Sequence, residues 1–463
     1  MHQIQNIIKN KNYSCDSRLI KKNDIFFDLE SSKNQNGKYL PEALKKKPFK
    51  IITENNQLRN NLNYIVVNDI KLFFKKMVID KFKNKPKYMF AVTGTNGKSS
   101  IAYFFYKILR NLKYKVGSIG TLGVYSNNKI INSNLTTPSF LDNHKIFNNF
   151  FKKNIKYSII EASSHGLKQA RLDSFKFYGG IFTNFTRDHL DYHKTFKDYL
   201  ESKLILFKKL IKKKGYIISN SEIDQFSTLK KIAKNKKLKI LSLGNNGNTI
   251  KIISLKNKRN FILLKINALN KIYNLKLNLI GRFQVENFLQ AAISIKSIGI
   301  SFDKIFSNCS KIKNPVGRLQ LINKNKKNVI IDYAHTPDAL RKTINEIKLF
   351  FDKEVNLVFG CGGDRDRGKR KVMGSIANKL CKKVYITDDN PRYENAAFIR
   401  NEIKKSCSKG IIVPSREKAI MKSIKDTRNE ILLISGKGHE TYQIIKDKKF
   451  YFSDFKCVNK YLR

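Results

Sequence analysis

The chain has 463 residues and a mass of 53.7 kDa, a length that predicts about three domains. It carries 92 Lys and Arg residues against 36 Asp and Glu residues, which gives a formal net charge of +56. An apolar content of 41% excludes a disordered basic tail, and no apolar run approaches the roughly 18 residues that a transmembrane helix needs.

The basic residues are spread along the whole chain together with Asn and Ile, whereas a nucleic-acid-binding surface concentrates its charge on one element or stripe. We therefore expect no nucleic-acid partner and interpret the excess as composition drift in an AT-rich genome; a basic nucleic-acid-binding protein is the alternative. The six cysteines form no CxxC pair, and the N-terminus lacks the apolar core of a signal peptide. These features predict a cytoplasmic protein without a membrane partner.

Two breaks in the pattern divide the chain. Lys83-Asn84-Lys85-Pro86 ends a weakly patterned segment, and Asn314-Pro315 precedes a region in which apolar strands alternate with helical segments such as residues 337–351. We predict an α/β protein of three domains. These are a small N-terminal α/β domain (1–87), a central P-loop-type ATPase domain with a mainly parallel sheet (88–315), and a C-terminal Rossmann-like α/β domain (316–463).

A Gly-rich segment, residues 94–100 (GTNGKSS), follows an apolar run at 88–92 and precedes apolar residues at helical spacing over 101–112. A strand, a Gly-rich turn and a helix N-terminus together form a cradle for phosphate. Lys98 is suited to neutralise the β- and γ-phosphates, and the Ser99 hydroxyl is suited to bind Mg²⁺. The motif is a shortened variant, because Val92 stands where the usual first Gly would be; an ordinary Gly-rich turn is the alternative.

Two further clusters follow apolar runs, at strand ends where open α/β sheets bind ligands. Glu161 ends the first run and precedes small hydroxyl residues, and residues 183–193 are dense in His and Asp. Glu161 and His189 are candidates to hold a divalent metal, and oxygen ligands favour Mg²⁺. The spacing of His189 and His193 leaves zinc as an alternative, although no cysteine accompanies them. Each cluster also fits a capped loop.

Three loops in the last third of the chain also follow predicted strands: residues 360–370, 387–392 and 435–440. They carry Arg, Asn and Glu, which together suit a zwitterion, because Arg grips carboxylates and Glu accepts from ammonium. Solvated turns are the alternative. The first of these loops lacks the Gly-Lys-Ser/Thr ending, so we do not expect a second nucleotide site.

In this order the motifs resemble the Mur ligases, and among them the members that add diaminopimelate to UDP-N-acetylmuramoyl-L-alanyl-D-glutamate. The resemblance covers nearly the whole chain. Its motifs are DSR at 16–18, GTNGKS at 94–99, NLTTP at 134–138, EASSHGLKQAR at 161–171, NFTRDHLDYH at 184–193, GRFQVEN at 281–287, GR at 317–318, DYAHTP at 332–337, DNPR at 389–392 and GKGHE at 436–440. Gln284 departs from the Asn of many relatives, and Asn23 replaces a frequent Gly.

The resemblance implies an ATP-dependent amide ligase of cytoplasmic peptidoglycan precursor synthesis. It also implies that Mg²⁺ is the cofactor and that the protein is a monomer without a partner chain. ATP would phosphorylate the γ-carboxylate of D-Glu, because a carboxylate is a poor electrophile. An amine of meso-diaminopimelate would then attack the acyl phosphate, giving an amide, ADP and phosphate. The protein has to align these parts and screen negative charge.

The resemblance also implies the roles of single residues. The catalytic residues are Lys98, Lys203, His189 and Arg318. ATP is bound by Gly94, Thr95, Asn96, Gly97, Lys98, Ser99, Ser100, Asn287, Arg318 and Asp332. The UDP-muramoyl dipeptide is bound by Ser17, Thr136, Thr137, Ser163, Gln169 and Arg171. Diaminopimelate is bound by Arg365, Asp389, Asn390, Pro391, Arg392, Gly436 and Glu440. Metal is held by Ser99, Glu161, His189 and Lys203, the last as N6-carboxylysine, a carbamate formed from CO₂.

Arg392 matters most for the choice of amino acid. Diaminopimelate differs from lysine by a distal carboxylate, and a buried guanidinium without that carboxylate would be left unpaired. The DNPR and GKGHE motifs therefore disfavour the two alternatives within the family, a lysine-adding ligase and a folate-polyglutamate ligase. An inactive, degenerate ligase is a further alternative, which the complete set of ATP and metal motifs opposes.

Overall fold

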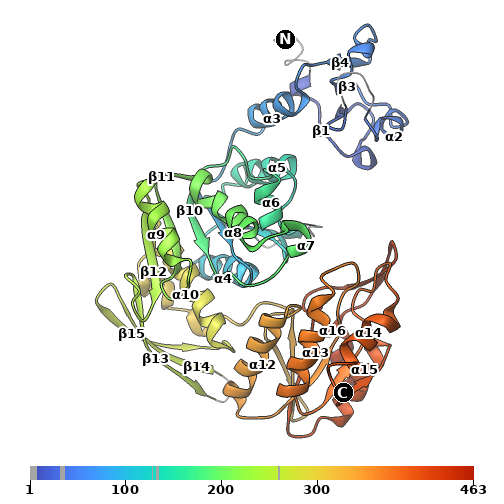
Figure 1. Ribbon diagram of the computed structural model, residues 1–463. Helices are drawn as coiled ribbons and strands as arrows, with labels where there is room; N and C mark the ends of the chain where they lie inside the picture. The colour runs from blue at the N-terminus through green and yellow to red at the C-terminus, as the bar shows by residue number, and fades with distance from the viewer. Residues whose placement is uncertain (1–7, 32–36, 128, 132–134, 259–260, 463) are drawn as a thin grey trace. The chain divides into compact units, whose positions relative to one another are not determined.

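The computed structural model of the chain describes residues 8–31, 37–127, 129–131, 135–258 and 261–462 (Figure 1). The described residues form two compact units. The first takes in those within 1–87, 138–156 and 170–174, and the second those within 88–137, 157–169 and 175–463.

The first unit is built on a parallel sheet in the order β1-β2-β3-β4. The strands are β1 (Tyr13–Ser14), β2 (Ile25–Phe27), β3 (Lys50–Thr53) and β4 (Tyr64–Val66). The helices are η1 (Ser17–Leu19), α2 (Leu40–Leu44), η2 (Asn56–Leu58), α3 (Ile70–Lys81) and α5 (Phe140–Lys152). Helix α3 begins where the Asp69 side chain caps the Leu72 amide at 2.8 Å. Its buried residues recur at helical spacing: Ile70, Phe73, Phe74, Met77 and Val78.

The second unit contains an eleven-stranded sheet in the order β15-β14-β13-β12-β11-β10-β5-β9-β6-β7-β8. Its parallel centre is β5 (Tyr88–Thr93), β6 (Val116–Gly120), β9 (Tyr157–Glu161), β10 (Phe177–Phe182), β11 (Ile211–Asn220) and β12 (Lys239–Gly244). Its antiparallel edges are β7 (Gly123–Ser126) and β8 (Lys129–Ile131) on one side, and β13 (Ile250–Lys258), β14 (Phe261–Ala268) and β15 (Lys271–Leu277) on the other. The long antiparallel extension β13–β15 was not predicted.

Helices cover both faces of this sheet. Helix α4 (Lys98–Asn111) packs against α10 (Arg282–Lys296) on one face, with Phe104 against Phe288. On the other face, Phe207 of η3 (Leu206–Leu210) contacts Phe182 of β10. The remaining helices of this region are α6 (Ser164–Lys168), α7 (Leu190–His193), α8 (Phe196–Ile205), α9 (Phe226–Asn235), α11 (Phe302–Phe306) and η4 (Cys309–Lys311).

The end of the chain forms a six-stranded sheet in the order β16-β17-β21-β18-β19-β20, parallel except for β16. The strands are β16 (Gln320–Lys324), β17 (Lys327–Asp332), β18 (Val355–Phe359), β19 (Val384–Ile386), β20 (Gly410–Ile412) and β21 (Ile431–Ser435), and a hairpin is formed by β22 (Tyr442–Ile445) and β23 (Lys448–Tyr451). The helices are α12 (Pro337–Phe351), α13 (Gly368–Leu380), α14 (Ala396–Lys404), α15 (Arg416–Asp426) and α16 (Asp454–Tyr461).

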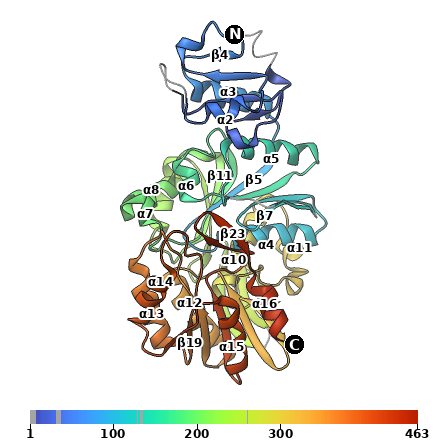
Figure 2. The same cartoon turned by 90° about the vertical axis from the view of Figure 1, so that its right-hand side faces the viewer.

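The two faces of the six-stranded sheet have separate cores. Residues of α12, α13 and α14 pack with Leu357 and Leu433 on one face, and residues of α15 and α16 pack with Val358 and Ile434 on the other. Figure 2 shows these two helix groups on either side of the strands. Alternate residues of β18 and β21 thus serve opposite cores, as buried parallel strands require. The α/β class with three sheet-bearing regions, predicted from the sequence, is confirmed.

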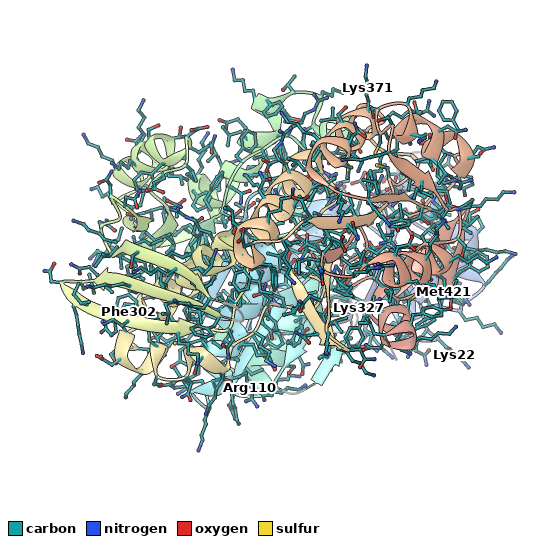
Figure 3. The ribbon with its side chains drawn as sticks, turned by 90° about the horizontal axis from the view of Figure 1, so that it is seen from below. Lys22, Arg110, Phe302, Lys327, Lys371 and Met421 are labelled. Atoms are coloured by element: carbon teal, nitrogen blue, oxygen red, sulfur yellow. The ribbon has the colours of Figure 1, made fainter. Side chains whose placement is uncertain are left out.

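Many lysine side chains are exposed, for example those of residues 45–47 and 212–214. Figure 3 shows long side chains with nitrogen ends projecting outward, among them Lys371 of α13. Within the described ranges, no helix combines the length and the apolar character that crossing a membrane requires.

Candidate active site

Residues 94–97 form the turn between β5 and α4, and residues 98–100 begin α4. Gly94 has φ 141° and Gly97 has φ 90°, values that L side chains rarely adopt. A Cβ atom at Gly97 would lie 2.6 Å from Oδ1 of Asn287, so glycine is needed there for space as well. The amides of Thr95 and Asn96 donate to the carbonyl and the side chain of Asn184, each at 2.9 Å. Asn184 therefore holds the backbone of the turn, and the two glycines supply the backbone conformations that the turn requires.

Lys98 lies at the start of α4 and folds over this turn. Its Nζ donates to the carbonyls of Gly94 at 2.9 Å and Thr95 at 2.8 Å. Burial lowers the pKa of Lys98, while the carboxylate of Glu161 opposes that shift. Ser99 and Ser100 are buried in the first helical turn. The helix N-terminus, a lysine and a serine hydroxyl thus meet at one point, which suits the phosphates of a nucleotide.

Glu161, at the end of β9, is 1% exposed and faces the Ser99 hydroxyl. Its Oε2 accepts from Ser99 Oγ at 2.9 Å and Thr121 Oγ1 at 3.1 Å, and its Oε1 accepts from the Thr121 amide at 2.8 Å. Burial raises the pKa of Glu161, and the charge of Lys98 opposes the rise. A carboxylate and a hydroxyl in contact are hard oxygen donors, so the pair fits Mg²⁺.

Three of the residues predicted for the muramoyl dipeptide adjoin Glu161. Thr136 Oγ1 lies 3.0 Å from Thr121 Oγ1, and Thr137 Oγ1 donates to the Glu161 carbonyl at 2.8 Å and lies 2.9 Å from Ser163 Oγ. Gln169 Nε2 donates to the Tyr192 hydroxyl at 3.2 Å. Asn134, the first residue of the predicted NLTTP motif, lies outside the described residues.

The other two predicted dipeptide residues belong to the first unit. The carbonyl of Arg171 accepts from Asn143 Nδ2 at 3.1 Å. Ser17 is buried in η1, where its hydroxyl donates to Glu42. Their roles toward the dipeptide stay predictions.

Lys203, on α8, is 1% exposed and reaches the same turn as Lys98. Its Nζ donates to the Gly94 carbonyl at 2.8 Å and lies 4.2 Å from the centroid of the Tyr199 ring. Burial lowers the pKa of Lys203 well below its ordinary value, and the nearby charge of Lys98 adds to the effect. These surroundings favour the neutral amine, the form that reacts with CO₂.

His189 has φ 53° and lies beside Asp188, with 3.3 Å between Nε2 and Oδ2. Burial lowers the pKa of His189 to about 4, so its ring is neutral at physiological pH and free to act as a ligand. His189 and Lys203 both lie against Tyr199, with ring centroids of His189 and Tyr199 6.0 Å apart.

His193, the second histidine of the possible zinc pair, is fully buried. Its Nε2 lies 2.9 Å from Ser164 Oγ, and its Nδ1 lies 3.3 Å from Ser202 Oγ and 3.5 Å from Asp198. Both ring nitrogens therefore have partners in the core. Over the ranges that the structure describes, no group of three or more His, Cys, Asp and Glu side chains is arranged to hold a metal ion.

Arg318 brings a second cation to the turn at residues 94–97, called the phosphate turn below. Its Nη2 lies 3.4 Å from Ser99 Oγ, and its guanidinium stacks 4.3 Å from the centroid of Tyr333. Asp332, at the end of β17, accepts from the amides of Leu319 at 2.7 Å and Ala334 at 2.8 Å. Its carboxylate thus joins the backbone after Arg318 to the backbone after β17. Burial raises the pKa of Asp332, and Arg318 opposes the rise.

The residues predicted for diaminopimelate line a cavity of about 380 Å³ at the ends of β18, β19 and β21. Asn390 Nδ2 donates to Glu440 Oε2 at 3.1 Å, and Arg392 Nη1 donates to the Gly363 carbonyl at 2.7 Å. A Cβ atom at Gly436, where φ is 114°, would lie 2.7 Å from Oδ2 of Asp389. The lining residues include Arg365, Asp389, Asn390, Arg392, Gly436 and Glu440. Pro391 lies between two of them, and its carbonyl would be 2.0 Å from a Cβ at Gly363.

The same cavity is lined by Asp188 and His189, which follow β10, and by Tyr333 and His335, which follow β17. The structure therefore brings the predicted metal-binding histidine and the predicted amino-acid residues to one opening. Tyr333, His335, Lys369 and Lys437 were not assigned a role from the sequence. Three of them stand inside the motifs given above, so the sequence marked their positions. Their charges and their contacts with neighbouring side chains become visible only in the folded chain.

Comparison with known proteins places these motifs in one family. Residues 92–295 match the Mur ligase middle domain, and residues 317–438 match the Mur ligase glutamate ligase domain. UDP-N-acetylmuramoyl-L-alanyl-D-glutamate–2,6-diaminopimelate ligase of Rickettsia conorii is 38% identical over 97% of this chain and 95% of its own. The enzyme of that name from Rickettsia bellii is 40% identical over 96% and 94%.

Solved structures agree with these matches. A structure of a UDP-N-acetylmuramoyl-L-alanyl-D-glutamate–2,6-diaminopimelate ligase superposes with a TM-score of 0.67 at 28% identity, covering 97% of this chain and 94% of that one. MurF ligase from Thermotoga maritima, solved in complex with ADP, superposes with a TM-score of 0.69 at 18% identity, covering 98% and 97%. At that lower identity the second likeness shows the fold.

Proposed function

The chain belongs to the Mur ligase family, and from that premise we propose how its residues carry out one reaction. It is an ATP-dependent amide ligase that adds 2,6-diaminopimelate to UDP-N-acetylmuramoyl-L-alanyl-D-glutamate, a step of peptidoglycan precursor synthesis. One observation supports the assignment most: Arg392 and Glu440, groups of opposite charge, line the cavity that His189 also lines.

In the first step, ATP transfers its γ-phosphoryl group to the free γ-carboxylate of D-Glu. Two cations converge on the place where that group would lie, because Lys98 covers the Gly-rich turn and Arg318 reaches Ser99. They screen the negative charge that accumulates as two anions approach. Thr136 and Ser163 offer hydroxyl groups near Glu161 to position the dipeptide, and the fully buried Thr137 supports Ser163.

Mg²⁺ is assigned to two pairs of side chains, in which His189 would supply a ring nitrogen and the others would supply oxygens. Ser99 and Glu161 would hold one ion, and His189 with Lys203 would hold a second. Lysine ammonium is no ligand, but the neutral amine favoured by burial at Lys203 can add CO₂ and become a carbamate. When bound, Mg²⁺ lowers the repulsion between the phosphate groups and the carboxylate.

In the second step, an amine of meso-diaminopimelate displaces phosphate from the acyl phosphate. The cavity holds a zwitterion by its charges: Arg392 takes the distal carboxylate and Glu440 accepts from an ammonium group. Arg365, which is exposed at the rim, is a second partner for carboxylate. The attacking amine is thereby directed toward His189 and the phosphate turn.

We assign the substrates to three domains, 1–87 for the uridine nucleotide, 88–315 for ATP and 316–463 for the amino acid. Three sheet-bearing regions support this division, and β16 begins just after the second boundary. We further propose a cytoplasmic monomer that binds neither nucleic acid nor membrane. Six cysteines without a disulfide and substrates of intracellular type support the compartment.

A coupled assay of phosphate release tests the function. Phosphate should appear only when ATP, UDP-N-acetylmuramoyl-L-alanyl-D-glutamate and meso-diaminopimelate are all present. L-Lysine in place of diaminopimelate is expected to lower kcat/KM by about 1,000-fold, because it offers no distal carboxylate to the half-buried guanidinium of Arg392. A higher kcat/KM with L-lysine, or release that requires a folate substrate, would contradict the assignment.

A further inference from the structure

Lys437 lies in the segment 436–440, between two residues of the cavity wall, and is 0% exposed. Its Nζ donates to Asn390 Oδ1 at 3.0 Å and to Glu440 Oε2 at 3.2 Å. Both acceptors line the cavity proposed for diaminopimelate. A buried lysine is costly without partners, so its contact with these two side chains ties its charge to the site.

We propose that Lys437 is a positioning residue for the amino-acid site: it keeps Glu440 an anion and Asn390 in a single amide orientation, so that the site accepts an ammonium group. The proposal rests on the function proposed above and concerns how that same site recognises its substrate. Lys437 acts through Asn390 and Glu440 and does not touch the substrate itself.

The hydrogen bonds fix the orientation of the Asn390 amide. Oδ1 accepts from both Lys437 Nζ and the Ile444 amide, each at 3.0 Å, and Nδ2 donates to Glu440 Oε2 at 3.1 Å. A flipped amide would set Nδ2 against two donors, which the lysine makes unfavourable. In the described part of the chain, the side-chain contacts of Glu440 go to Oε2, which leaves Oε1 to accept from a ligand.

The charge of Lys437 also governs the charge of Glu440. Burial raises the pKa of Glu440, and Lys437 is the largest influence that lowers it. The titratable and charged groups that act on Glu440 or respond to its charge are Lys437, Asp389, Arg392, Arg416, Tyr333 and Tyr442. Without Lys437 the pKa of Glu440 rises further, so the protonated fraction grows near neutral pH and shrinks again as the pH is raised.

The test is Lys437→Met in the full-length enzyme, with steady-state kinetics for each substrate at pH 7.0 and pH 8.5. We expect the KM for meso-diaminopimelate to rise about tenfold at pH 7.0 and distinctly less at pH 8.5, with the KM for ATP unchanged. Lys422→Met, on the exposed side of α15, is the matched control and should leave all three KM values as they are. Lys437→Arg, which keeps the charge, should recover part of the loss.

The possible results distinguish a failure of the proposed function from a failure of the role proposed for Lys437. A wild-type enzyme without diaminopimelate-dependent phosphate release refutes the proposed function. An active wild type with an unchanged KM in Lys437→Met, or a rise of equal size at both pH values, refutes the role of Lys437 alone. If Lys437→Met does not fold, Glu440→Gln and the double variant replace it, because a neutral Gln needs no cation. Lys437→Met should then add little to the KM of Glu440→Gln, and a further tenfold rise would overturn the proposal.

Discussion

Lys203 shows how a residue's chemistry depends on its surroundings. It is an ordinary lysine in the sequence, but in the fold its burial, together with the nearby charge of Lys98, lowers its pKa and favours a neutral amine. Lys203→Arg keeps a long basic side chain but cannot form the carbamate. We expect kcat to fall at least ~100-fold, because a metal-binding group is lost. Steady-state phosphate release measures this change.

The control for this variant is Lys208→Arg, on the neighbouring turn, where the exposed Lys208 pairs with Glu201. It should keep wild-type kcat, and both variants should keep the wild-type midpoint of thermal unfolding. Lys203→Ala should regain part of its turnover when a small carboxylic acid is added. Wild-type kcat in Lys203→Arg would remove the proposed role.

Arg392 is predicted to set the choice of amino acid. Its φ of 53° and its bond to the Gly363 carbonyl hold the guanidinium at the cavity, and burial lowers its pKa with help from Arg365. Arg392→Lys keeps the charge but loses the planar fork that binds a carboxylate through two hydrogen bonds. The kcat/KM for meso-diaminopimelate should fall about 100-fold, while that for L-lysine changes little.

The measurement is a comparison of both amino acids at saturating ATP and UDP-substrate. An equal loss with both amino acids would mean that Arg392 supports the cavity wall and does not read the distal carboxylate. The exposed Arg428 offers a control, since Arg428→Lys should change neither value.

The turn between β5 and α4 makes a prediction at the level of an element. Gly97→Ala places a side chain at φ 90° and its Cβ against Asn287, whereas Gly299→Ala, at φ 95°, meets nothing within 4 Å. Both variants should lose about 1–2 kcal/mol of stability from backbone strain. Gly97→Ala alone should also lower kcat/KM for ATP about 100-fold, because misplacement by an ångström weakens alignment.

Denaturant unfolding and ATP kinetics of the two variants separate strain from function. An ATP defect of equal size in Gly299→Ala would show that backbone strain lowers activity wherever it occurs. A normal KM and kcat in Gly97→Ala would remove the turn from the nucleotide site.

The elements differ in how far their sequences predict them. Residues 337–351 were predicted as a helix and form α12 over the same span, because Thr336 caps it, Pro337 begins it and its apolar residues recur on one side. The antiparallel strands β13–β15 were not predicted, although they are consecutive and pair locally, with Ala268 of β14 opposite Lys271 of β15. Buried residues alternate with more exposed ones along β14, so the local signal was present in this segment.

The site divides in the same way. Gly94, Lys98 and Ser99 form a contiguous motif whose spacing alone predicts a phosphate turn. Lys437 stands in an equally visible motif. Its contact with Asn390, however, depends on strands β19 and β21 flanking β18 and ending at the same edge of the sheet. Residues whose role depends on partners far along the chain need the fold before their chemistry can be argued.

The charge of the whole molecule is the feature that its function explains least. The residues proposed to bind anions are few, and most of the +56 charge lies outside the motifs. Such a field still acts on substrates, since a strongly positive protein attracts anions over distances comparable to the Debye length. The substrates differ usefully here: ATP and the UDP-linked dipeptide are strongly anionic, whereas diaminopimelate has two ammonium and two carboxylate groups and no net charge.

The positive field should therefore attract ATP and the UDP-linked dipeptide but have little effect on diaminopimelate. Raising KCl from 50 to 300 mM is expected to lower kcat/KM for the UDP-dipeptide about threefold or more, because salt screens long-range attraction. The same change should leave kcat/KM for meso-diaminopimelate nearly constant, and kcat at saturation should not move. Diaminopimelate is the internal control, since general salt inhibition would affect it equally. Equal losses for both substrates would show that the lysine excess plays no part in capturing them.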